Sequence, residues 1–165
     1  MCGAVAIKYD PAMKEKLTKF FTAEEIARFE TNGEIVFAYW DKRPMLPIRK
    51  GKEICFIDWG NRDEKLPLPK TGWARLESLL EKKWDHLKPK VVLIPAQRGC
   101  EKKVWFDLAT DIKAVLVQKD GIERVYMITE AATPDYQAMT KHERMPRLME
   151  NYAISEKQSV VSKNV

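Results

Sequence analysis

The chain contains many short apolar runs, and this pattern constrains its fold more than any other feature of the sequence. Apolar residues alternate with smaller or polar ones from Cys2 to Tyr9, and runs rich in β-branched and aromatic residues recur downstream. The later runs cover residues 34–40, 53–59, 91–94, 104–108, 114–117 and 125–129. Short runs of this kind, bounded by turn-forming residues, are typical of strands. We therefore expect strands to outnumber helices, with Asp120-Gly121 as the turn between the last two.

Few segments have helical spacing. Asp10-Pro11 is a favourable helix start, and Thr22 followed by Glu25 matches a capping box that restarts or bends this helix. The apolar residues between Trp73 and Leu87 recur every three or four positions, which predicts the clearest helix of the chain. These elements together predict a compact α+β domain with two or three helices and a mainly antiparallel, curved, barrel-like sheet.

The domain organisation of the chain is predicted from its length, its prolines and its polar last segment. A chain of 165 residues has the size of one ordinary domain. The segment with Pro44 and Pro47 cannot pair as a central strand. The polar stretch 155–165 has no clear period, so we expect one domain over residues 1–154 followed by a mobile tail.

Composition indicates the setting of the protein. The net charge of +5 and the pI near 9.0 favour a polyanionic partner. The three cysteines, Cys2, Cys55 and Cys100, lack the spacing of a disulfide framework, which indicates a reducing compartment. The first residues do not resemble a basic leader ahead of a long apolar stretch, and no apolar run approaches the roughly 20 residues of a membrane span. We expect a cytoplasmic protein that does not bind a membrane.

Cys2 would have unusual chemistry if Met1 were removed. Its α-amine and thiol would then lie on neighbouring carbons and could together trap an aldehyde as a five-membered thiazolidine. The reference pKa values are about 8 for an α-amine and about 8.5 for a thiol, so little tuning is needed. Gly3 has no side chain to obstruct a substrate. Taken alone, however, Met-Cys-Gly also fits the plain start of a strand.

Motifs further along the chain give Cys2 a context. They are Trp59-Gly60, Trp73-Ala-Arg-Leu-Glu77, Ile94-Pro-Ala-Gln-Arg-Gly-Cys-Glu101 and His142-Glu-Arg-Met-Pro146. With Met1-Cys-Gly3 they resemble, in order, the pattern of the SRAP family, the SOS-response-associated peptidase domain that crosslinks to abasic sites in single-stranded DNA. The resemblance covers most of residues 1–149 and implies a short, divergent member with roles in the SOS response and DNA repair.

The resemblance implies a role for each matching residue. Cys2 would be the nucleophile, Glu101 a catalytic carboxylate and His142 the general acid and base, with no cofactor. Such groups can supply the proton transfers of aldehyde capture. Related self-processing would expose Cys2, so the implied activity is that of a cysteine peptidase and DNA-crosslinking protein.

The implied partner is single-stranded DNA that contains abasic sites, bound by a monomer that associates with the nucleoid. Gly3, Trp59, Trp73, Arg75 and Arg98 would line the DNA path, and Lys102 and Lys103 would add phosphate contacts. Trp73 stands where the family has an active-site asparagine. This departure implies either slower chemistry or another group in the role of the amide.

Three alternatives remain open from sequence. The first is a DNA-binding module of the same fold that has lost catalysis. The second is a cysteine hydrolase in which Cys2 attacks an acyl carbon with His142 as base. The third is a metal site made from the cysteines and the two histidines, although no Cys-x-x-Cys or His-x-x-x-His spacing favours it.

Overall fold

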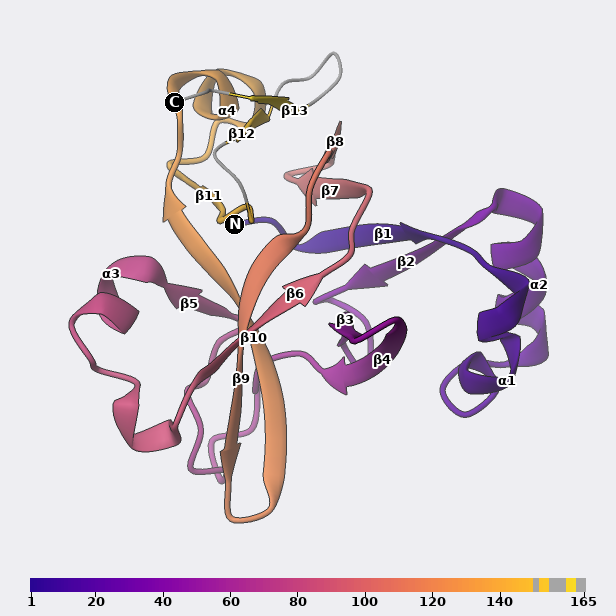
Figure 1. Cartoon of the computed structure of the whole chain (residues 1–165), viewed down its shortest axis with the longest axis horizontal. Helices are drawn as coiled ribbons and strands as arrows, with labels where there is room; N and C mark the ends of the chain where they lie inside the picture. The colour runs from indigo at the N-terminus through magenta and orange to yellow at the C-terminus, as the bar shows by residue number, and fades with distance from the viewer. Residues whose placement is uncertain (150–151, 155–159, 163–165) are drawn as a thin grey trace.

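Antiparallel sheets make up most of the structure, a computed structural model that describes residues 1–149, 152–154 and 160–162 (Figure 1). The predicted α+β class is confirmed, and strands outnumber helices as expected. The described residues form four α-helices rather than two or three. These are α1 (Lys14–Leu17), α2 (Ala23–Asn32), α3 (Leu76–Leu80) and α4 (Pro134–Thr140). The described sheets remain separate and do not close into a barrel.

The first sheet contains the start of the chain. Its strand order is β2-β1-β7-β8, and all its pairs are antiparallel. The strands are β1 (Ala4–Lys8), β2 (Glu34–Ala38), β7 (Arg98–Glu101) and β8 (Val104–Asp107). In the centre, Ala4 of β1 lies opposite both Ala38 and Cys100. This register brings the amino terminus beside the end of β7.

The second sheet has the order β11-β10-β9-β6, with β5 added in parallel to β10. Its strands are β5 (Trp73–Arg75), β6 (Lys90–Ile94), β9 (Ile112–Lys119), β10 (Ile122–Ala131) and β11 (Arg144–Pro146). Asp120 and Gly121 form the predicted turn between β9 and β10, with φ values of 52° and 79°.

Two hairpins complete the set of strands. The strands β3 (Met45–Lys50) and β4 (Glu53–Asp58) pair as a two-stranded sheet. Pro47 lies within β3, so the proline-containing segment forms a strand, but not a central one. β12 (Tyr152–Ile154) pairs with β13 (Val160–Ser162). Thus residues 160–162 of the expected tail form a strand, and the rest of that tail lies outside the described residues.

The helix predictions had mixed outcomes. A 3-10 turn, η1 (Pro11–Met13), follows Asp10, and Thr22 and Glu25 form the predicted capping box at the start of α2. The single helix predicted between Trp73 and Leu87 is wrong. That segment contains β5, the short helix α3 and a second 3-10 turn, η2 (Asp85–Leu87).

Tertiary contacts explain this error. The backbone of residues 73–75 pairs with β10, so its hydrogen bonds are made across the sheet rather than along a helix. Lys82 has a φ of 62°, which ends the helical geometry after α3. The apolar spacing nevertheless reflects burial, because Trp84 and Leu87 pack in a cluster with Tyr126.

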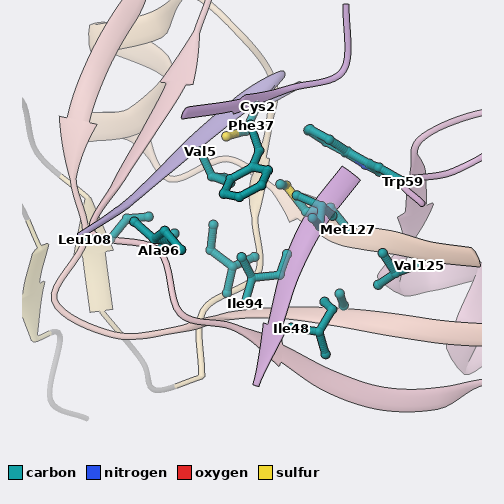
Figure 2. Close-up of a cluster of buried hydrophobic side chains, with 14 of the residues drawn as sticks. Cys2, Val5, Phe37, Ile48, Trp59, Ile94, Ala96, Leu108, Val125 and Met127 are labelled. Atoms are coloured by element: carbon teal, nitrogen blue, oxygen red, sulfur yellow. The ribbon is translucent and has the colours of Figure 1, made fainter. Parts of the chain in front are cut away.

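The main core lies between the two larger sheets and the β3–β4 hairpin. Figure 2 shows Cys2, Val5 and Phe37 in the same buried cluster as Ile94 and Met127. Through Cys2 and Val5, this cluster holds the first residues of the chain against the core. No helix among the described residues is both long and apolar enough to cross a membrane.

Candidate functional site

The amino terminus lies between a carboxylate and an imidazole. The α-amino nitrogen of Met1 is 2.7 Å from Oε2 of Glu101 and 2.7 Å from Nε2 of His142. Figure 1 shows the N-terminus close to β11. The structure thus brings Glu101 and His142 together at the start of the chain, and the group that they contact belongs to Met1.

The pairing of β1 with β7 positions Glu101. The Gly3 amide donates a hydrogen bond to the Cys100 carbonyl over 2.9 Å, which holds the first residues against the end of β7. The Glu101 side chain is only 4% exposed, so its contact with the α-amine is shielded from solvent. In a setting of this kind an electrostatic contact is stronger than at the surface.

The tight turn after Glu101 has an unusual conformation. Lys102 and Lys103 connect β7 to β8, and their φ values are 48° and 70°. Both residues are therefore in the left-handed region, where a two-residue hairpin turn favours asparagine and glycine. Strain of this kind often occurs at functional sites. The Lys102 ammonium donates to the Lys141 carbonyl over 3.0 Å, which ties the turn to the segment before His142.

The loop between α4 and β11 positions His142. Lys141 ends α4 in the left-handed conformation, and the His142 amide donates to Oγ1 of Thr140 over 3.3 Å. The Arg144 amide donates to Nδ1 of His142 over 3.0 Å. This hydrogen bond holds the ring with Nε2 facing the Met1 amine.

An ion pair joins two of the motif segments. The Arg144 guanidinium donates to both carboxylate oxygens of Glu77, over 2.7 and 3.1 Å, and to the Thr129 carbonyl over 2.8 Å. The hydrogen bond to Arg144 lowers the pKa of Glu77. This pair links the His142 loop to the segment that begins with Trp73.

The Cys2 thiol is buried in the core. The residue is fully buried, and Sγ donates to the Ala4 carbonyl over 3.3 Å. Burial raises the pKa of the thiol to about 12, so it is protonated at neutral pH. In this arrangement with Met1 present, Cys2 contributes backbone to the site and its side chain to the core.

A pocket of about 670 Å³ opens beside Met1 and Glu101. Besides Cys100 and Glu101, three kinds of group line it: the amino-terminal residues, a set of aromatic rings and several cations. The aromatic residues are Tyr39, Trp40, Trp73 and Trp105, and the cationic residues are Arg62, Lys102 and Lys103. Apolar walls with a few charged groups are typical of a ligand site.

Only two of the residues predicted to line the DNA path also line this pocket. Gly3 and Trp73 line this pocket, and the Trp73 indole donates to the Cys2 carbonyl over 3.0 Å. Trp59 is only 1% exposed and donates to the Gly72 carbonyl, which leaves no face for a base. Arg75 is exposed on β5 but is not among the residues that line the pocket.

Arg98 already has partners. Its guanidinium makes two hydrogen bonds to the Glu34 carboxylate, over 2.8 and 2.9 Å. It also lies 4.6 Å from the centre of the Trp105 ring, a cation–π distance. Arg98 therefore covers Trp105, a wall of the pocket, rather than presenting an unoccupied cation to a phosphate.

Sequence reasoning missed several pocket residues. The pocket is also lined by four residues that belong to none of the motifs found in the sequence: Tyr39, Trp40, Arg62 and Trp105. Trp40 is 66% exposed, which is unusual for so large an apolar side chain. One usable signal was its position at the end of an apolar run, directly before Asp-Lys-Arg.

Among the residues whose side chains are described, no group of three histidine, cysteine, aspartate or glutamate residues could hold a metal ion. Comparisons of the chain with models of protein families, with curated proteins and with solved structures found no match.

Proposed function

We propose that this chain binds single-stranded DNA and forms a covalent bond with the aldehyde of an abasic site through its amino-terminal residue. After removal of Met1, that residue is Cys2. The observation that carries the proposal is the position of the amino terminus, 2.7 Å from both Glu101 and His142 at the edge of an aromatic pocket.

The chemistry needs an amine, a base, an acid and a thiol. The amine nitrogen attacks the aldehyde carbon, His142 donates a proton to the carbonyl oxygen, and Glu101 accepts a proton from the nitrogen. Loss of water then leaves an iminium ion. The Cys2 sulfur adds to its carbon and gives up its proton, which closes a thiazolidine with release of one water overall.

Ring closure requires a local rearrangement. The thiol is buried beside Ala4, so it must turn toward the pocket after Met1 is lost. Trp73 holds the Cys2 carbonyl and lines the pocket, which gives this residue a positioning role where the family has asparagine.

The rest of the pocket suits single-stranded DNA. Trp40 has the exposure needed to stack on an unpaired base, and base stacking on aromatic side chains tolerates any sequence. Lys102 and Lys103 are exposed at the pocket rim and can contact phosphates. We assign the DNA contacts to these residues in preference to Trp59 and Arg98.

Intact mass spectrometry of the chain, alone and after incubation with an abasic single-stranded oligonucleotide, tests the proposal. We expect loss of Met1, and then an adduct equal to protein plus DNA minus one water. A matched oligonucleotide with a tetrahydrofuran site, which has no aldehyde, should bind without forming the adduct. Equal labelling of Cys2→Ala, without reduction, would contradict the proposal.

A further inference from the structure

We infer that the chain which retains Met1 already has an aldehyde-reactive amine, and that Met1 forms an imine there without help from the Cys2 thiol. The inference uses the same pocket as the proposed function. It rests on that function for the DNA-borne aldehyde alone, because imine formation at Met1 needs neither DNA binding nor removal of Met1.

Two groups beside the amine can take a proton from it. The Met1 nitrogen lies 2.7 Å from Oε2 of Glu101 and 2.7 Å from Nε2 of His142. Nδ1 of His142 accepts from the Arg144 amide, which holds the ring with Nε2 toward the amine. Transfer of a proton from the amine to either group leaves the uncharged amine, which is the nucleophilic form.

The surroundings give an aldehyde access to this nitrogen. Met1 lines the pocket, and its side chain is 34% exposed, whereas that of Glu101 is 4% exposed. The Cys2 thiol is directed to the core and is absent from the pocket lining. The Met1 amine therefore reaches the pocket, as do the amines of Lys102 and Lys103, whereas the Cys2 thiol does not.

The two neighbours of the amine can carry the required protons. Glu101 takes one proton from the amine, the nitrogen bonds to the carbonyl carbon, and Glu101 passes that proton to the carbonyl oxygen. Glu101 then takes a second proton from the nitrogen and delivers it to the hydroxyl, which leaves as water. His142 accepts the last nitrogen proton. One protonated amine and one aldehyde thus give one imine, one water and a proton on His142, with no oxidant or reductant.

The pocket rim indicates the class of aldehyde. Lys102 and Lys103 line the pocket and are exposed, and Trp40 and Trp105 line it with them. The Arg62 guanidinium already donates to three backbone carbonyls. We assign the site to open-chain sugar aldehydes that carry phosphate, because the two lysines can pair with phosphate oxygens. Both an abasic site in DNA and a free sugar phosphate have this chemistry.

Borohydride trapping with peptide mapping tests the inference. The full chain is released from a cleavable fusion so that Met1 is its first residue, which intact mass confirms. It is incubated with glyceraldehyde 3-phosphate or with abasic single-stranded DNA, then reduced. We expect the reduced adduct on the Met1 amine with either probe, and the same yield in Cys2→Ala.

Three variants test whether Glu101 and His142 accelerate imine formation at the Met1 amine. Glu101→Gln and His142→Gln should lower the trapping rate by about 10²-fold or more, the range of general acid–base groups. A chain with one extra glycine before Met1 moves the amine away from both groups, and it should lose the fast reaction while its unfolding midpoint is unchanged.

The outcomes separate the two proposals. An adduct on Met1 with the sugar phosphate but none with abasic DNA would support the imine and overturn the DNA function. Adducts on lysines alone, dependence of trapping on the Cys2 thiol, or an unchanged rate in the glycine-extended chain would each overturn the inference.

Discussion

Glu77 accepts two hydrogen bonds from the Arg144 guanidinium, although 67 positions separate the residues in the chain. The pair connects the segment that starts at Trp73, which holds the Cys2 carbonyl, to the loop that carries His142. It therefore links the segment of Trp73, which lines the pocket, to the loop of His142. We infer that this ion pair holds the two segments in their relative position.

Replacement of Arg144 by lysine tests the contribution of this ion pair to stability. Lysine keeps the charge but cannot donate the two parallel hydrogen bonds, and Arg144 is 9% exposed. We expect a loss of about 1–3 kcal/mol in the free energy of unfolding, measured in urea. Glu77→Gln should lose less, since the Glu77 side chain is 49% exposed.

The same pair should make stability depend on acid pH. Arg144 holds the pKa of Glu77 below its usual value near 4.3. The stabilisation is therefore present above the unfolded pKa and is lost as pH falls through the lower folded pKa. The part of the acid dependence that Glu77 contributes should be absent in Glu77→Gln. An identical slope in both proteins would contradict the assignment.

The Cys2 thiol should be slow to react in the chain that retains Met1. With a pKa of about 12, its thiolate fraction at pH 8 is about 10⁻⁴. Cys55 is half-buried and should be alkylated first by iodoacetamide, as read by peptide mapping. All three cysteines should react in denaturant, and early labelling of Cys2 in native protein would refute the buried arrangement.

Substitutions in the turn formed by Lys102 and Lys103 should raise the stability of the fold and weaken DNA binding. The double change Lys102→Asn and Lys103→Gly relieves two left-handed lysines and should stabilise the fold by about 1–2 kcal/mol. It removes two rim cations, so affinity for single-stranded DNA should fall and become less dependent on salt. Chemical denaturation and fluorescence anisotropy at two salt concentrations measure the two effects.

Two tryptophans should separate binding from folding. Trp40→Ala should weaken binding of single-stranded DNA by about 1–3 kcal/mol with little change in stability, because the side chain is 66% exposed. Trp59→Ala should cost about 3–5 kcal/mol of stability through the cavity that it leaves. The opposite assignment of effects would show that Trp40 lies outside the binding surface.

Several strands were predictable because local pattern and burial agree, whereas β3, β5, β7 and β11 were not predicted. The runs at residues 91–94 and 104–108 and the Asp120-Gly121 turn match β6, β8 and the β9–β10 hairpin closely. The region from Trp73 to Leu87 was not predictable, because pairing of β5 with β10 overrides its helical spacing. Such pairing depends on residues about 50 positions away.

The site was predictable in part. The motif order led to Glu101 and His142, which the structure places on the same amine. Spacing alone could not reveal that this amine belongs to Met1, nor that the Cys2 thiol packs in the core. Side-chain direction at the first residues depends on β1 lying between β2 and β7, a non-local arrangement.

The most direct test of the central claim is the rate at which the chain lacking Met1 crosslinks to abasic single-stranded DNA, followed by denaturing gel without reduction. The proposed mechanism predicts a stable adduct that Cys2→Ala abolishes and that Glu101→Gln and His142→Ala form about 10²–10⁴-fold more slowly. Trp73→Asn shows whether an amide at this position accelerates the reaction. A stable adduct that forms equally fast in Cys2→Ala would contradict the mechanism.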